Sequence, residues 1–145
     1  MTGDSNVLLA FDFGLRRIGI ASGNVLTRTA SPLTTLSFKQ ELPWAELNRL
    51  IDAWRPGRLV VGLPNDAGAS SIADSVRIFA QELGHRFELE VNLVDETLTS
   101  EASRSYLREG RRSGYLRRRV AKGRLDRHAA CLIAEQWLNE NRHAD

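Results

Sequence analysis

The chain is predicted to fold as an α/β protein with a mixed five-stranded sheet flanked by helices. Three strand-like stretches follow one another closely within residues 7–37, which is typical of an antiparallel meander. After residue 42, segments with apolar residues at helical spacing alternate with short apolar runs, as expected for helices that cover a sheet. The length of 145 residues is sufficient for a real core, so we expect a single domain over residues 1–145.

The first hairpin is predicted to begin in the stretch Val7–Ile20, which carries an acid where apolar residues dominate. The run V-L-L-A-F-D-F is apolar enough for a strand buried on both faces, yet Asp12 lies near its end. Gly14 begins a tight turn, and Arg17–Asn24 is expected to form the second strand. Gly19 has no side chain, so a bulky group can approach the backbone of that strand.

The later elements are predicted from periodicity and from turn residues. Pro32 suits an edge strand or a bulge, since it cannot donate a hydrogen bond within a sheet. We expect strands at Thr29–Ser37, Arg58–Leu63 and Leu89–Glu96. Helices are expected at Leu42–Trp54, about Ile72–Arg86, from a cap at Thr99 or Ser100 to about Arg108, and at Asp126 to about Asn141, with a mobile loop at Glu109–Arg124. This order of elements is that of the ribonuclease-H-like fold.

The basic residues are concentrated in one segment. Residues 104–127 contain ten Arg or Lys against two acids, a charge of +8, whereas the rest of the chain has ten basic and sixteen acidic residues, a charge of −6. Such a patch is typical of a surface that binds a polyanion, although a solvated face paired with the acidic body is the alternative. The residues expected to contact nucleic acid are Arg111, Arg112, Arg117, Arg118, Arg119, Lys122 and Arg124.

Three acids are expected where the ends of strands and helices converge. They are Asp12, Glu96 and Asp126. In the last predicted helix, Asp126 shares a face with Ala130, Ile133 and Trp137, so the face that packs on the sheet also turns Asp126 toward it. Converging carboxylates repel one another, and a divalent cation relieves that repulsion. Hard oxygen ligands suit Mg²⁺ or Mn²⁺, which can activate a water for phosphodiester cleavage.

Each acid also has an interpretation without catalysis. Asp12 could accept hydrogen bonds in the turn beside Gly14, and Glu96 could be a solvated strand end. Asp126 could be the N-cap of the last helix or the partner of its dipole. The residues alone leave both interpretations open for all three acids.

Four short motifs give the chain a family resemblance. They are A-F-D-F-G-x-x-x-I-G-I-A at 10–21, V-V-G-L-P at 60–64, D-E-T-L-T-S at 95–100 and L-D-R-H-A-A at 125–130. Together they resemble the YqgF/RuvX family, which is related to the Holliday-junction resolvase RuvC. The resemblance implies a ribonuclease-H-like fold, a Mg²⁺- or Mn²⁺-dependent nuclease site, and maturation of the 5′ end of pre-16S ribosomal RNA. Asp12, Glu96 and Asp126 match the acidic positions of the family, as catalytic residues and metal ligands.

Two other functions stay open beside precursor-RNA cleavage. One is resolution of branched DNA, which needs two symmetric cuts and therefore a dimer. The other is a non-catalytic RNA-binding factor in ribosome assembly, because Thr97 stands where the family usually has arginine and the loop at 64–71 is short. We expect a monomer or a weak homodimer, since the sequence offers no obvious apolar patch for a dimer.

Other classes of site and location are disfavoured. The chain has no G-x-x-x-x-G-K phosphate-binding motif, and its histidines lack the spacing of zinc ligands. Cys131 lies among apolar helix residues, so we expect it in the core, as we do Trp44, Trp54 and Trp137 for their helical spacing. No stretch is long enough to span a membrane and no secretory signal is evident, so the expected location is the cytoplasm.

Overall fold

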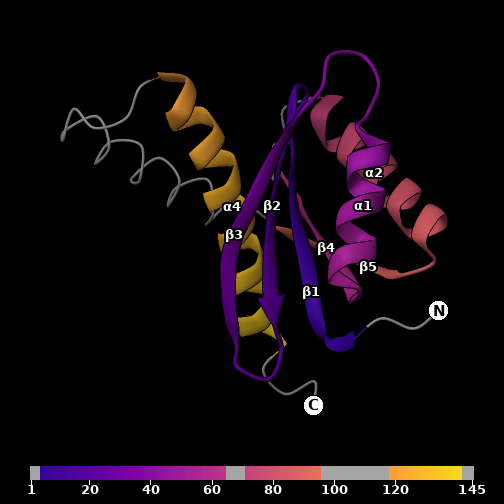
Figure 1. Ribbon diagram of the computed structural model, residues 1–145, viewed down its shortest axis with the longest axis vertical. Coiled ribbons are helices and arrows are strands. Elements are labelled where there is room, and N and C mark those ends of the chain that lie inside the picture. The colour runs from indigo at the N-terminus through magenta and orange to yellow at the C-terminus, as the bar shows by residue number, and fades with distance from the viewer. Residues whose placement is uncertain (1–3, 65–70, 96–117, 142–145) are drawn as a thin grey trace.

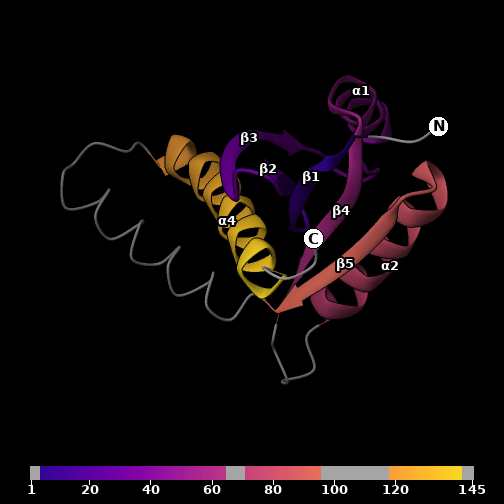
Figure 2. The ribbon, with the colours of Figure 1, turned by 90° about the horizontal axis from the view of Figure 1, so that it is seen from below.

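The sheet of this protein is mixed, and helices cover both of its faces. The computed structural model describes residues 4–64, 71–95 and 118–141. Within them the strands lie in the order β3-β2-β1-β4-β5. The elements are β1 (Asp4–Phe13), β2 (Arg17–Asn24), β3 (Thr29–Ser37), α1 (Trp44–Trp54), β4 (Pro56–Leu63), α2 (Ser71–Phe87), β5 (Glu90–Asp95) and α4 (Arg118–Glu140). Helices α1 and α2 lie on one face and α4 on the other (Figures 1 and 2).

The strand pairing confirms the predicted α/β fold with its five-stranded mixed sheet. Strands β1, β2 and β3 pair antiparallel, and β1, β4 and β5 pair parallel. Pro32 lies in the edge strand β3, where the register with β2 shifts between Ile20 and Ala21. This irregularity is the bulge expected for a proline in a sheet.

The two faces of the sheet carry separate apolar cores. Leu9 and Phe11 of β1 pack under α1 and α2, whereas Leu8 and Ala10 pack under α4. Phe79 of α2 is the centre of the first core, and the rings of Phe13 and Trp44 stack on it at centroid distances of 4.7 and 5.9 Å. The second core is formed by Leu8, Ala10, Val60, Val94, Ile133, Ala134, Trp137 and Leu138.

The start of α4 differs from the prediction. The helix begins at Arg118, not at Asp126, so residues 118–124 are helical and the predicted loop is wrong for that part. Gly123 lies inside the helix at a cost of about 1 kcal/mol relative to alanine. Packing of the following turns on the sheet outweighs that cost, because most helical stability comes from tertiary contacts. Residues 109–117 and the predicted helix at 100–108 lie outside the described residues.

Of the three tryptophans predicted for the core, Trp137 is buried and Trp44 packs partly buried against the first core. Trp54 is 40% exposed, so its prediction was wrong. Trp54 is the last residue of α1, and Arg55 ends the helix with a left-handed φ of 48°. Helical spacing predicted a buried face but not the point at which the helix leaves the sheet.

Candidate active site

Asp12 lies near the carboxyl end of β1, on the face that α4 covers. Side chains alternate along a strand, and Leu8 and Ala10 belong to the core under α4, so Asp12 shares their face. In the antiparallel pair of β1 with β2, Asp12 lies opposite Gly19. Residues opposite each other in such a pair are about 4.5–5.5 Å apart at Cα and point to the same side. Whatever lies over Gly19 is therefore a neighbour of Asp12.

The group that lies over Gly19 is the main chain of Asp126. A Cβ on Gly19 would overlap the carbonyl oxygen and carbon of Asp126, and it would be 2.9 Å from the nitrogen of Arg127. Real Cβ atoms do not approach backbone so closely, so only glycine allows α4 to lie at this depth. The expectation that Gly19 admits a bulky group is confirmed, and that group is a helix backbone. This contact places the main chain of Asp126 over the residue that pairs with Asp12 in the adjacent strand.

The side chain of Asp126 is held by Arg17. The Arg17 Nε donates to Asp126 Oδ2 at 2.7 Å, and the two side chains are 35% and 22% exposed. Because α4 begins at Arg118, Asp126 lies inside the helix and cannot be its N-cap. The predicted shared face is confirmed, since Ala130, Ile133 and Trp137 are all buried.

Glu96, the third predicted acid, lies outside the described residues and follows directly after the last residue of β5. The parallel register aligns Phe11 with Val61 and Val61 with Leu93, so β1 and β5 end at the same edge of the sheet. Val94 belongs to the core under α4. Within residues 4–64, 71–95 and 118–141, no three His, Cys, Asp or Glu side chains are grouped as for a metal ion.

The basic segment is described only in part. Arg111, Arg112 and Arg117 lie outside the described residues. The remaining predicted phosphate contacts lie in the first half of α4, and they are Arg118, Arg119, Lys122 and Arg124. This half of α4 immediately precedes Asp126 in the same helix. The predicted basic residues of α4 therefore lie in the same helix as Asp126, the acid whose main chain contacts Gly19.

Cys131 is a core residue, as predicted. It is buried in a small cluster with Ala21 and Ala130. Burial, with a smaller contribution from the charge of Glu135, raises the pKa of the Cys131 thiol from 9.0 to about 11. A thiol with a raised pKa is a poor nucleophile at neutral pH, so Cys131 is not a candidate for covalent catalysis.

Sequence reasoning missed Arg17 as a partner of Asp126. A usable signal was present, because residues 17, 19 and 21 alternate onto one face of β2. Ala21 packs against α4, and Gly19 lies against the same helix. The partner on α4 could not be assigned without the packing of the helix on the sheet.

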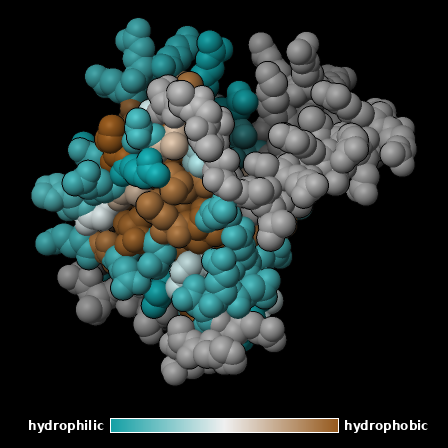
Figure 3. Space-filling view, turned by 180° about the vertical axis from the view of Figure 1, so that it is seen from behind, coloured by the Kyte–Doolittle hydropathy of each residue, from teal (hydrophilic) through white to brown (hydrophobic). Residues whose placement is uncertain are grey.

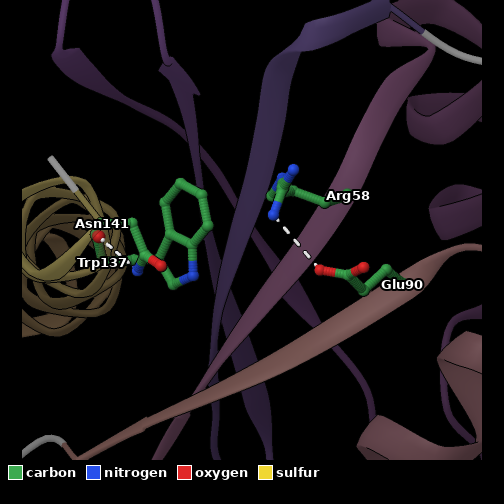
Figure 4. A network of polar contacts seen from close by, with 4 residues as sticks. All are labelled: Arg58, Glu90, Trp137 and Asn141. Carbon is green, nitrogen blue, oxygen red and sulfur yellow. Dashed lines mark hydrogen bonds and ion pairs between the residues drawn. The ribbon is translucent and has the colours of Figure 1, made fainter. Parts of the chain in front are cut away.

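A second polar cluster, also missed, fixes the other half of α4 to the sheet (Figure 4). The Arg58 guanidinium lies 4.7 Å from the centre of the Trp137 ring, and its Nη1 is 3.2 Å from Glu90 Oε2. The Asn141 side-chain nitrogen donates to the Trp137 carbonyl oxygen at 2.9 Å. Arg58 pairs in register with Leu8, about 13 Å along β1 from Asp12 at 3.3 Å per residue. This cluster is therefore an anchor for α4 and not part of the acidic site.

The face of the molecule opposite to the Figure 1 view has an area where hydrophobic residues gather (Figure 3). Elements β5 and α2 lie on that side, and their exposed large apolar side chains are Leu93 (45% exposed) and Ile78 (62% exposed). Among the described residues, no helix has both the length and the apolar composition needed to cross a membrane.

Solved structures with this fold include nucleic-acid enzymes. RuvC of T. thermophilus, solved with a Holliday junction substrate, matches with a TM-score of 0.60 and 12% identity over 94% of this chain and 96% of its own. The Fowlpox virus resolvase, solved with Holliday junction DNA, matches with a TM-score of 0.55 and 11% identity over 92% and 97%. At such identities the likeness defines the fold, which is the ribonuclease-H-like α/β fold of the resolvases.

The sequence comparison identifies the family. The RuvX family, described as Holliday junction resolvase, matches residues 6–140, and the chain belongs to this family. A relative from Legionella pneumophila (strain Paris) is 44% identical over 93% of this chain and 96% of its own length. One from Francisella tularensis subsp. mediasiatica is 35% identical over 92% and 97%. Both carry the name "Putative pre-16S rRNA nuclease". Family and fold fit a nuclease, a phosphodiester hydrolase, as the sequence predicted.

Proposed function

We propose that this protein is a divalent-metal-dependent nuclease that cleaves precursor ribosomal RNA at the 5′ side of 16S rRNA. The observation that carries the proposal is the contact of the Asp126 main chain with Gly19, the residue that lies opposite Asp12 in the neighbouring strand, so both acids belong to one face of the sheet. The names of the relatives support precursor 16S rRNA as the substrate.

The donor set of this site fits Mg²⁺ or Mn²⁺. Asp12 and Asp126 supply carboxylate oxygens, the hard ligands that both cations prefer, and Glu96 follows the strand that ends at the same edge. These three acids would hold the cation, which would supply charge neutralisation and activate a water for hydrolysis. These cations do not need sulfur or imidazole ligands. Cys131 is accordingly not among the proposed ligands, and it is buried with Ala21 and Ala130.

The basic residues position the substrate in this proposal. Contacts to phosphate oxygens fix the register of a nucleic acid but carry little sequence information. The basic first half of α4 precedes Asp126 directly. A nucleic-acid backbone bound along this helix would therefore extend toward the acids of the proposed site. The residues proposed for this role are Arg111, Arg112, Arg117, Arg118, Arg119, Lys122 and Arg124.

Resolution of branched DNA is the second candidate, and the description of the family favours it. A resolvase makes two symmetric cuts and works as a dimer. Cleavage is therefore measured with Mn²⁺ or Mg²⁺ on two substrates, a precursor 16S rRNA 5′ leader and a four-way DNA junction, beside the mass of the protein in solution. Leader cleavage by a monomer supports the proposal, whereas junction cleavage by a dimer supports the second candidate. RNA binding in EDTA without cleavage under any condition would indicate a non-catalytic assembly factor.

The decisive variant is Asp12→Asn. It should abolish cleavage and leave the melting temperature unchanged or higher, because it removes one of several mutually repelling carboxylates. Asp52→Asn is the matched control, since Asp52 is an exposed acid in α1, on the other face of the sheet from α4. A loss of several kcal/mol of stability in Asp12→Asn would instead make Asp12 a structural hydrogen-bond acceptor, and the site assignment would be wrong.

A further inference from the structure

We propose that Arg17 is the internal counter-ion of Asp126 in the metal-free protein and competes with a divalent cation for that carboxylate. The inference rests on the proposed function, since it concerns the cation site placed at Asp12 and Asp126. It adds a residue that the acidic motifs do not contain, and it predicts the direction in which that residue changes metal affinity.

The contact itself is a strong one for a partly exposed pair. Nε of Arg17 lies 2.7 Å from Oδ2 of Asp126, within the range of charge-assisted hydrogen bonds. Ion pairs elsewhere among the described residues can be longer and more exposed, such as Arg77 with Asp74 at 3.5 Å, with side chains that are 57% and 81% exposed. The Arg17 pair also joins residues 109 positions apart in sequence, so it reports tertiary packing and not helix periodicity.

The two partners are held in place by their backbones. Gly19 lies two residues after Arg17 in β2, and the Asp126 main chain rests directly on it. Ala21, two residues further on, packs against Ala130, one turn further along α4. Both side chains therefore start from backbones with fixed separation, which lowers the entropy lost when the pair forms.

The position of Arg17 gives it opposite effects in the two states of the site. Without a cation, the guanidinium balances the negative charge of the Asp126 carboxylate that it contacts. With a divalent cation on Asp126, the guanidinium becomes a like charge a few ångströms away and loses part of its hydrogen bond. Binding of the cation and formation of the Arg17–Asp126 pair therefore oppose each other, and the coupling is reciprocal.

The test is Mn²⁺ affinity, measured by calorimetry or electron paramagnetic resonance without nucleic acid. Arg17→Gln should bind Mn²⁺ more tightly, by roughly tenfold, because a charged hydrogen bond and a like charge are both removed. Arg17→Lys keeps the charge and should stay near wild type. Arg16→Gln is the matched control, because Arg16 is the exposed neighbour in the same hairpin and makes the same change in net charge.

A second measurement follows the pair without any metal. In EDTA, Arg17→Gln should lower the melting temperature when it is introduced into the wild-type protein. Introduced into the Asp126→Asn variant, it should have no such effect, since the partner of Arg17 is already neutral there. Equal or weaker Mn²⁺ binding by Arg17→Gln overturns the inference while leaving the cation site intact. Absence of Mn²⁺ binding in wild type, Arg17→Gln and Arg17→Lys alike overturns the cation site and, with it, the inference.

Discussion

The main-chain carbonyl of Asp126 lies where a side chain at residue 19 would be, so Gly19 and Asp126 are in direct backbone contact. One glycine thus sets the depth at which α4 packs on β2. Asp12 lies opposite Gly19 in the neighbouring strand, so the same contact sets the separation of the two acids. The stability of the fold and the geometry of the proposed site depend on this single position.

Replacement of Gly19 by alanine is expected to lower stability by about 3 kcal/mol, near the upper end of the usual cost of overpacking, because a backbone cannot move aside as a side chain can. Mn²⁺ binding and cleavage should be lost with the displaced helix. Urea unfolding and calorimetry measure the two effects. Gly84→Ala in α2 is the matched control, since its Cβ would make only ordinary contacts, at 3.4 Å or more. That change should raise stability by about 0.5–1 kcal/mol.

Asp126→Asn separates the role of this residue in the fold from its role in the site. Loss of the ion pair should cost only about 0.5–1 kcal/mol, because Arg17 is 35% exposed and water can solvate its charge. Metal-dependent cleavage should fall by orders of magnitude, since an amide is a poor ligand for a hard cation. Asp74→Asn breaks an exposed pair on α2 and should change neither quantity. Retained cleavage in the Asp126 variant would leave the proposed site without this ligand.

The joint replacement of Arg117, Arg118 and Arg119 by glutamine tests the basic segment. Each phosphate contact to a single strand contributes roughly −0.7 to the slope of log affinity against log salt, so the slope should flatten by about two units. Binding should weaken alike for different sequences, and cleavage at saturating substrate should change much less. Fluorescence anisotropy in EDTA at several salt concentrations gives the slope.

The control for this triple variant removes the same charge elsewhere. Arg49, Arg55 and Arg77 are exposed residues in or next to α1 and α2, on the opposite face of the sheet from α4. Their joint replacement by glutamine should leave the salt slope nearly unchanged. Equal slopes for wild type and the Arg117–Arg119 variant would show that the basic segment does not face nucleic acid.

Cys131 gives a prediction that depends on pH. Its pKa is raised by burial from 9.0 to about 11, so the unfolded protein ionises this thiol first as pH rises. The contribution of Cys131 to stability is therefore present below pH 9 and is lost as the pH rises from 9 toward 11. Cys131→Ser should show a smaller fall in melting temperature across that range. At pH 8, the folded protein should react with thiol reagents only as fast as it opens, and urea should restore rapid labelling.

The local elements were largely determined by the sequence itself. Apolar runs and alternation predicted the strands, and the bulge at Pro32 followed from the missing amide hydrogen of proline. Helical spacing predicted that Ala130, Ile133 and Trp137 face the sheet, and they are buried. These predictions succeed because they depend on backbone geometry and on the burial of apolar area, which are encoded within a few residues.

The start of α4 and the partner of Asp126 were decided by tertiary structure. Arginines and three glycines between residues 109 and 124 predicted a loop, yet the helix extends back to Arg118 because later turns are anchored on the sheet. The sequence showed that Gly19 leaves room for a bulky group, but not which one. That choice, and with it the contact between Arg17 and Asp126, depends on how a helix more than a hundred residues away packs, because contact energies act in space and not along the chain.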